Sequence, residues 1–295
     1  MATLGLHREE ETTLNSAYEY CRQVARREAR NFYYGFRLLP PPRRRAIYAA
    51  YAFSRLCDDV ADGDLPLEEK VGRLAQYRRG LDFSLAGRPE GPVFTALADA
   101  IHRYSIPAQY FQELIDGVEM DLGHRRYETF AELYGYCYRV AAVIGLITIE
   151  ICGHREPSPA RDFAIDLGVA LQLTNILRDI KEDSVRDRIY VPLEEMEWFG
   201  YSESDLFQER ATPAFRGLVG FQVRRAILYF ERGQQLLPLL PFRSRACVAV
   251  LQGIYRAILK RIAAHPDAIF QGQVGLSGAE KLTLTGKLWF QSLLH

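Results

Sequence analysis

Apolar residues recur at intervals of three and four positions along almost the whole chain, for example in "AIYAAYAFSRLCDDVAD" (residues 46–62) and "FAIDLGVALQLTNILRDI" (residues 163–180). This spacing is typical of amphipathic α-helices, whose apolar side chains return to one face about every 3.6 residues. No stretch keeps the alternation of apolar and polar residues that a half-buried β-strand shows. The pattern therefore predicts an all-α protein.

Proline and glycine clusters separate these segments, at residues 38–42, 86–92, 154–160 and 236–242. None of them is long enough to be a flexible linker between domains, and the sequence has no internal repeat of the kind that builds a solenoid. We predict a single domain covering residues 1–295, a bundle of roughly ten or more helices, with a loosely ordered N-terminus over residues 1–15.

The composition suits a globular protein, because 48% of the 295 residues are hydrophobic, enough to bury a sizeable core. The 37 basic and 37 acidic residues cancel, so the overall charge does not favour a nucleic-acid partner. The five cysteines are scattered without a CxxC pair. This disfavours a disulfide framework and a zinc site, and it favours a reducing cytoplasm.

Two features argue against membrane insertion and export. The longest uncharged apolar run, residues 140–149, is about half of the ~20 residues that a membrane-spanning helix needs, so we expect a buried helix segment there. The N-terminus carries acidic residues where a signal peptide would be basic, so we expect no export signal.

Two of the helical segments carry oxygen-bearing side chains spaced four residues apart. In "RLCDDVAD" the pair Asp58 and Asp62, here called the first ladder, lies on one helix face, about 40° apart around the axis. In "LQLTNILRDIKED" the same spacing occurs twice, in Asn175, Asp179 and Asp183, here called the second ladder. Each ladder follows a long apolar segment, so its side chains fall where the helix should still be largely buried.

Acid pairs with this spacing are common on solvated helix faces, and either ladder alone would be interpreted in that way. Like charges four residues apart destabilise a helix by about a few tenths of a kcal/mol, and burying an unpaired carboxylate costs much more. A divalent cation would remove both penalties. Because the donors are all oxygens, a hard cation such as Mg²⁺ fits best, with water and substrate phosphate as its other ligands.

Basic residues are interleaved with the ladders: Arg55, Arg178, Lys181, Arg186 and Arg188. They are either surface salt-bridge partners of small energetic value or donors to phosphate oxygens. Two facing acidic helices would hold a diphosphate through Mg²⁺ and make it a better leaving group. The 17 Tyr and 16 Phe residues would then supply an aromatic, water-poor cavity in which an allylic carbocation can form.

The stretch "LGVALQLTNILRDIKEDSVRDRIYVP" (residues 167–192) resembles a signature of the squalene and phytoene synthase family, the head-to-head isoprenyl transferases. "YCYRVAAVIG" (residues 136–145) resembles the other signature of the family, and "RLCDDVAD" resembles its first aspartate-rich motif. Weaker similarities extend over nearly the whole chain. The resemblance implies a single all-α domain of the isoprenoid-synthase type, a helical bundle around a central cavity.

The resemblance also implies a role for each matching position. The ligands of Mg²⁺, on two sides of the cavity, would be Asp58, Asp62, Asn175, Asp179 and Asp183. The residues that contact diphosphate or order the site would be Arg55, Gln172, Arg178, Arg188 and Tyr190. Tyr136 would lie beside the reacting carbons as a cation stabiliser or proton relay, whereas without the surrounding motif it would be interpreted as a core tyrosine.

The chain departs from the family pattern near both ends. Ala29 and Asn31 stand where many members have serines; Asn31 can still hydrogen-bond phosphate, and Ala29 cannot. Gln273 and Gly278 stand where many relatives have basic residues. Fewer phosphate contacts at these positions would affect the turnover rate and the specificity for diphosphate.

Family members join two identical allylic diphosphates through a cyclopropyl intermediate. The stretch of residues 32–63 and the short chain are most similar to the bacterial presqualene diphosphate synthases of hopanoid pathways. We therefore expect two farnesyl diphosphates to give presqualene diphosphate, with Mg²⁺ and without NADPH; the lack of a GxGxxG fingerprint agrees weakly with this. Two alternatives stay open, a phytoene synthase that uses geranylgeranyl diphosphate and a squalene synthase that uses NADPH.

A rival interpretation from another class is a non-catalytic helical binding or assembly protein of the same fold. Such a protein would be expected to lack aspartates in one or both ladders, but both ladders are complete here. The hydrophobic product that the resemblance implies is compatible with a cytoplasmic protein that contacts membranes peripherally.

Overall fold

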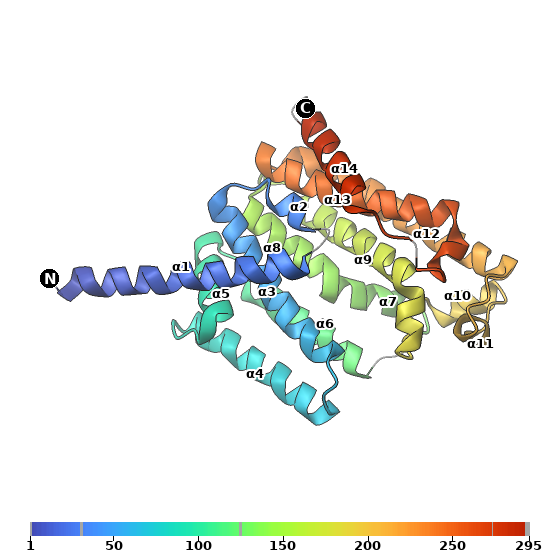
Figure 1. The fold of residues 1–295 in the computed structure, drawn as a ribbon, viewed down its shortest axis with the longest axis horizontal. Helices are drawn as coiled ribbons and strands as arrows, with labels where there is room; N and C mark the ends of the chain where they lie inside the picture. Colours follow the sequence, from blue (N-terminus) through green and yellow to red (C-terminus); the bar gives the residue numbers. More distant parts are fainter. Residues whose placement is uncertain (1, 30–31, 124–125, 273, 293–295) are drawn as a thin grey trace.

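The computed structural model describes residues 2–29, 32–123, 126–272 and 274–292, without the side chains of residues 2–12 and 291–292 (Figure 1). Up to residue 152 the elements are α1 (Ala2–Glu28), α2 (Phe32–Phe36), α3 (Pro41–Asp62), α4 (Leu67–Leu85), α5 (Gly91–Tyr104), α6 (Ala108–Gly123), α7 (Phe130–Cys137), the π-helical turn η1 (Tyr138–Ala142) and α8 (Val143–Cys152). From residue 160 they are α9 (Ala160–Val185), α10 (Leu193–Trp198), α11 (Glu203–Phe207), α12 (Pro213–Gly233), η2 (Gln234–Leu239), α13 (Phe242–Ala264), η3 (Pro266–Ile269) and α14 (Gly278–Ser292). The described residues contain no β-strand, which confirms the predicted all-α class.

Proline and capping side chains start several helices at the predicted breaks. Pro41 lies in the first turn of α3 and Pro213 in the first turn of α12, where a residue without a backbone N–H leaves no hydrogen bond unmade. The Thr212 hydroxyl accepts a hydrogen bond from the backbone N–H of Phe215, which caps α12. Local sequence therefore sets where these helices begin.

Helix α9 is central to the bundle and packs against α8, η1, α12 and α13 (Figure 1). Gly168 permits the close approach of η1, because a Cβ atom at this position would lie 2.5 Å from the Cα atom of Ala142. Gly145 on α8 is similar, since a Cβ atom there would lie 2.7 Å from the carbonyl oxygen of Ala164. The glycines of these two helices let their backbones nearly touch.

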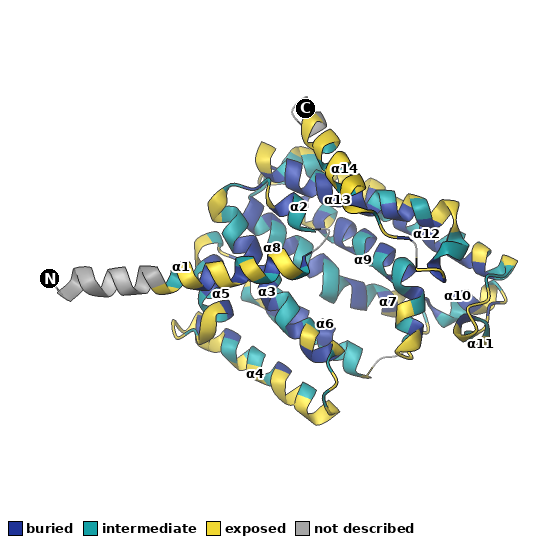
Figure 2. Ribbon diagram, in the orientation of Figure 1, coloured by how far each residue is buried: buried dark blue, intermediate teal, exposed yellow. Residues whose placement is uncertain are grey.

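The buried side chains form two clusters. Figure 2 marks buried residues in dark blue along helices such as α3, α9 and α13. One cluster lies mainly among α7, α9, α12 and α13, and the other among α1, α3, α5 and α6. Helix α8 contributes to both, with Leu146 in the first cluster and Ile147 in the second. The shared helix ties the two clusters together, although the single domain over residues 1–295 stays a prediction.

The continuous helical stretch Phe130–Cys152 is, among the described residues, the one long and apolar enough to cross a membrane by length and composition. Half of its apolar window is buried inside the protein, as core helices also are. Val143, Leu146 and Ile149 are buried, which confirms the prediction of a buried segment within residues 140–149.

Helix α1 begins at Ala2, inside the segment 1–15 for which we predicted loose order, and that prediction stays untested. From Ala17 onward, the helix packs on α3 and α5 through small buried residues such as Cys21 and Ala25. All five cysteines are buried free thiols.

Candidate active site

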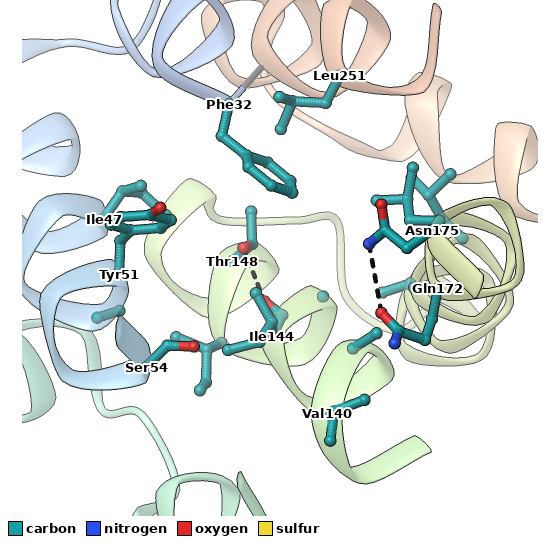
Figure 3. A pocket seen from close by; sticks show the side chains of 18 of the residues that line it. Phe32, Ile47, Tyr51, Ser54, Val140, Ile144, Thr148, Gln172, Asn175 and Leu251 are labelled. Carbon is teal, nitrogen blue, oxygen red and sulfur yellow. Dashed lines mark hydrogen bonds between the residues drawn. The ribbon is translucent and has the colours of Figure 1, made fainter. Parts of the chain in front are cut away.

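A cavity of about 350 Å³ lies where the two buried clusters meet. Figure 3 shows Phe32 from α2, Tyr51 from α3, Ile144 from α8 and Leu251 from α13 around this space. Its walls are mostly apolar and aromatic, so we call it the apolar cavity. Such a space can hold a hydrocarbon chain away from water.

A second cavity, of about 260 Å³, adjoins the first and is lined mainly by charged and polar side chains. We call it the polar chamber. The six residues that line both spaces, here called the neck, are Arg55, Asp58, Asp121, Tyr136, Gln172 and Asn175. A substrate with a charged head and a long apolar tail would place its head in the polar chamber and its tail in the apolar cavity, with the bond between them at the neck.

The first ladder stands on the α3 wall of the polar chamber. Burial raises the pKa of Asp58 to about 7, with further contributions from Asp62 and Asp121, while Arg55 opposes the shift. The Asp62 side chain is 36% exposed, and its Oδ1 accepts hydrogen bonds from Arg186 at 3.1 Å and from Arg188 at 3.4 Å. The partly exposed Asp62 thus has two arginine partners, whereas Asp58 is the more desolvated carboxyl of the first ladder.

The second ladder stands on the α9 wall. Arg178 donates two hydrogen bonds to the Asp179 carboxylate, at 2.7 and 2.5 Å. Burial, followed by the charge of Asp179, raises the pKa of Asp183 to about 7. The Asn175 side-chain N–H donates to Oε1 of Gln172 at 3.4 Å, as Figure 3 shows.

The structure brings all five ladder residues to the wall of one chamber. Gln172, Arg178, Arg188 and Tyr190 line the same chamber, and Arg55 and Tyr136 line the neck. The predicted positions of these residues are therefore consistent with one site, while their roles remain proposals. Asn31 and Gln273 lie outside the described residues.

The remaining two departures from the family pattern fall elsewhere. Ala29 is buried just after the end of α1, and Gly278 is exposed at the start of α14. Neither residue lines the apolar cavity or the polar chamber.

The donor set of the chamber fits a hard cation. Within the described part of the chain, Oδ1 of Asn175 is a buried acceptor without a hydrogen-bond partner. The raised pKa values of Asp58 and Asp183 also mark carboxylates that a nearby cation would stabilise in their charged form. In the described residues, no three His, Cys, Asp or Glu side chains are close enough to hold a metal by themselves, so substrate oxygens and water would complete its coordination.

Asp121, at the end of α6, is a neck residue that the sequence reasoning missed. Its carboxylate accepts hydrogen bonds from the hydroxyls of Tyr190 at 2.8 Å and of Tyr136 at 3.1 Å. A signal was present in the sequence, because Leu114, Val118 and Asp121 have the i, i+4, i+7 spacing of one helix face. An acid that continues a buried apolar stripe is a candidate site residue.

Tyr136 is both a core residue and a residue of the neck. It is buried, and its ring lies 5.1 Å from that of Tyr190 and 5.5 Å from that of Tyr127, centroid to centroid. The π-helical turn η1 begins two residues after Tyr136; such turns frequently mark functional sites. The two interpretations of Tyr136 given by the sequence are therefore compatible.

A helical bundle whose apolar cavity adjoins a chamber between two acidic helices defines a class of prenyltransferases that act on isoprenyl diphosphates. Residues 25–280 match the model of the squalene/phytoene synthase family, and the chain belongs to this family.

Named relatives agree with this assignment. The chain is 38% identical to the 15-cis-phytoene synthase of Synechococcus elongatus over 271 residues, 88% of each chain. It is 39% identical to the phytoene synthase of Mycobacterium tuberculosis over 273 residues, 92% of this chain and 89% of that one.

Solved structures agree as well. A dehydrosqualene synthase crystallised with a ligand superposes with a TM-score of 0.89 at 27% identity, covering 97% of this chain and all of that one. The squalene synthase HpnC from Alicyclobacillus acidocaldarius superposes with a TM-score of 0.80 at 29% identity, covering 89% of this chain and 97% of that one. The predicted fold and enzyme class are confirmed.

Proposed function

We propose that the protein condenses two molecules of geranylgeranyl diphosphate head to head, in a Mg²⁺-dependent reaction that yields phytoene. The observation that carries the reaction class is the neck, where an apolar cavity meets a polar chamber. There, in the described structure, Nε of Arg55 is a buried donor and Oδ1 of Asn175 a buried acceptor, each without a hydrogen-bond partner. A diphosphate with its cation would satisfy both atoms.

The choice of substrate rests on the relatives. The two compared above are phytoene synthases, identical to this chain at 38% and 39% of positions. This favours the alternative that the sequence reasoning left open over its first choice, presqualene diphosphate from farnesyl diphosphate. The first choice stays as the second candidate, because the structural neighbours at 27% and 29% identity are dehydrosqualene and squalene synthases.

The arginines and the ladder residues have different roles toward the diphosphate. Mg²⁺ would be held by Asp58, Asp62, Asn175, Asp179 and Asp183, and it would supply the positive charge that makes diphosphate a better leaving group. Arg55, Arg178 and Arg188 bind phosphate oxygens as fixed cationic donors. In doing so, Arg178 and Arg188 exchange their present carboxylate partners, Asp179 and Asp62, for phosphate.

The apolar cavity protects the cation that forms when the diphosphate leaves. The aromatic rings of Phe32, Phe36 and Tyr51 line it, and aromatic faces attract positive charge without adding to it as water would. Tyr136, in the neck, lies between this cavity and the leaving diphosphate. The site therefore separates the developing charges while it excludes water.

The test is product identification by mass spectrometry after incubation of the purified protein with Mg²⁺ and each substrate, with and without NADPH. We expect phytoene from geranylgeranyl diphosphate, independent of NADPH. Presqualene diphosphate from farnesyl diphosphate as the dominant product would establish the second candidate, and squalene formed only with NADPH would establish a squalene synthase. Absence of any condensation product would instead favour the non-catalytic binding protein.

We also propose that the protein is cytoplasmic and contacts membranes peripherally, because its hydrocarbon product is insoluble in water. Leu282 and Phe290 on α14 are 64% and 58% exposed, and Lys287 is exposed on the same helix. Co-sedimentation with anionic vesicles, reduced by the double substitution of Leu282 and Phe290 with serine, is the expected result. Equal recovery with and without vesicles would refute the contact.

A further inference from the structure

The carboxylate of Asp121 joins two tyrosines from distant parts of the chain. Tyr190, which follows α9, donates its hydroxyl proton to Oδ1 at 2.8 Å, and Tyr136, on α7, donates to Oδ2 at 3.1 Å. The two hydroxyl oxygens are 3.5 Å apart, which is long for a hydrogen bond between hydroxyls. The carboxylate is therefore the better acceptor for both protons.

The single proton of the Tyr136 hydroxyl determines whether this group faces the cavity as a hydrogen-bond donor or with its lone pairs. A tyrosine hydroxyl has one proton and can accept hydrogen bonds through its lone pairs. Burial raises the pKa values of Tyr136 and Tyr190 well above their usual range, so both hydroxyls keep their protons. With its proton directed toward α6, the oxygen of Tyr136 presents only lone pairs in other directions.

We propose that Asp121 is a positioning residue that orients the hydroxyl of Tyr136, so that its oxygen faces the neck as an electron-rich group and not as a proton donor. This inference rests on the proposed function, because an oxygen lone pair stabilises a nearby carbocation whereas an O–H dipole pointed at the cation opposes it. It assigns Tyr136 the first of the two roles that the family resemblance left open, that of a cation stabiliser.

Ring packing and hydroxyl orientation are separable here. The rings of Tyr127, Tyr136 and Tyr190 hold one another, with centroids 5.1 to 5.8 Å apart. Asp121 contacts this group through hydrogen bonds to two of its hydroxyls. A change from carboxylate to carboxamide therefore alters the orientation of the protons and leaves the ring stack in place.

The substitution Asp121→Asn tests the proposal. The amide has the same shape, but it offers one acceptor and one donor group, so one tyrosine oxygen must accept and its own proton must turn away. We expect kcat to fall by about 10- to 100-fold, with KM changed by less than about twofold. The matched control is Asp116→Asn on the same helix, where the carboxylate pairs with Arg78 at 2.7 Å outside the site, and activity should be unchanged.

A double-mutant cycle separates positioning from direct action on the substrate. If Asp121 acts through Tyr136, then Asp121→Asn added to Tyr136→Phe should change kcat by less than about twofold. Independent, multiplying effects of the two substitutions would overturn the proposal. An increase in KM with kcat unchanged would also overturn it, since that result would mark Asp121 as a binding group.

A spectroscopic measurement tests the hydrogen bond without turnover. The tyrosine doublet in ultraviolet resonance Raman spectra distinguishes a hydroxyl that donates from one that accepts, and the difference between wild type and Tyr136→Phe isolates Tyr136. We expect a donor pattern in the wild-type protein and its loss on the Asp121→Asn background. An acceptor pattern in the wild type would overturn the proposal even if the protein proved inactive, whereas a donor pattern in an inactive protein would count only against the proposed function.

Discussion

The two ladders carry similar oxygen donors on opposite walls of the polar chamber, yet their charges are balanced in different ways. Asp62 of the first ladder is paired across the chamber, with Arg186 and Arg188 from the segment after α9. Asp179 of the second ladder is paired along its own helix, with the adjacent Arg178. Each ladder also keeps one carboxyl group whose pKa burial raises to about 7, Asp58 and Asp183.

This difference predicts which arginine a substrate displaces first from its carboxylate partner. The Arg186 side chain is 55% exposed, and exposed ion pairs contribute little to stability. Arg178 and Asp179 are each 27% exposed and joined by two hydrogen bonds, so their pair is the stronger one. We therefore expect diphosphate alone to draw Arg186 away from Asp62, which would keep the 15% exposed Arg188, and we expect the release of Asp179 to require a cation that competes with Arg178.

The largest expected effect comes from removing one carboxylate from each wall. Asp58→Asn and Asp179→Asn should each lower kcat/KM by about 1000-fold or more, because each wall loses a ligand of the cation that neutralises the leaving group. Product formation under saturating Mg²⁺ measures the loss, and circular dichroism checks helix content. Asp162→Asn, at the exposed start of α9, is the control and should keep full activity. Unchanged activity of either ladder variant would remove that wall from the cation site.

The ladders could be predicted because the information is local. Asp58 and Asp62 lie four residues apart on one helix, as do Asn175, Asp179 and Asp183, and the preceding apolar segments already indicate burial. The helical class follows from the same periodicity, and proline marks the start of α3 and α12. Local spacing even contained a signal for Asp121, which continues the buried face of α6.

The partners of these residues could not be predicted, because they come together only in the folded bundle. Arg186 and Arg188 reach Asp62 across more than a hundred residues of sequence, and Asp121 on α6 meets Tyr190 after α9. The depth of the apolar cavity depends on how α2, α3, α8 and α13 pack together, with residues such as Phe32 and Leu251 at its wall. The length of substrate that the cavity accepts is therefore determined by tertiary packing and not by any sequence motif.

The Arg178–Asp179 pair is predicted to contribute more to the free energy of unfolding than the exposed Arg186–Asp62 pair. Arg178→Gln should lower the free energy of unfolding of the metal-free protein by about 1–3 kcal/mol, because it leaves the partly buried Asp179 carboxylate without its charged donor. Urea denaturation measures this loss, and added Mg²⁺ should recover part of it by taking the place of the arginine at Asp179. The control Arg73→Gln removes a pair on α4 whose two side chains, Arg73 and Glu69, are 45% and 47% exposed, so a smaller loss is expected. A loss that Mg²⁺ does not reduce would contradict competition between Arg178 and the cation.

The raised pKa values of Asp58 and Asp183 predict how stability depends on pH in the absence of metal. Both carboxyls take up protons in the folded protein near pH 7, and in the unfolded chain only near pH 4. The folded state therefore binds more protons in this range, and the free energy of unfolding should rise as pH falls from 7.5 to 5.5, by up to about 1 kcal/mol per pH unit for each group. The neutral variants Asp58→Asn and Asp183→Asn should each lose their share of this slope in calorimetric titrations, and saturating Mg²⁺ should suppress it. Slopes equal to that of the wild type would show that neither carboxyl is desolvated.

The smallest expected effect concerns Arg186, and it completes the comparison of the walls. Arg186→Gln removes an exposed donor at 3.1 Å from Asp62, while Arg188 remains at 3.4 Å, so the free energy of unfolding should change by no more than about 0.5 kcal/mol. Arg216→Gln, which removes a surface pair with Asp267 remote from the chamber, gives the baseline in the same urea titration. If Arg186→Gln destabilised the protein as much as Arg178→Gln does, the Arg186–Asp62 and Arg178–Asp179 pairs would contribute equally to stability. The ion pairs would then no longer predict which arginine is displaced first.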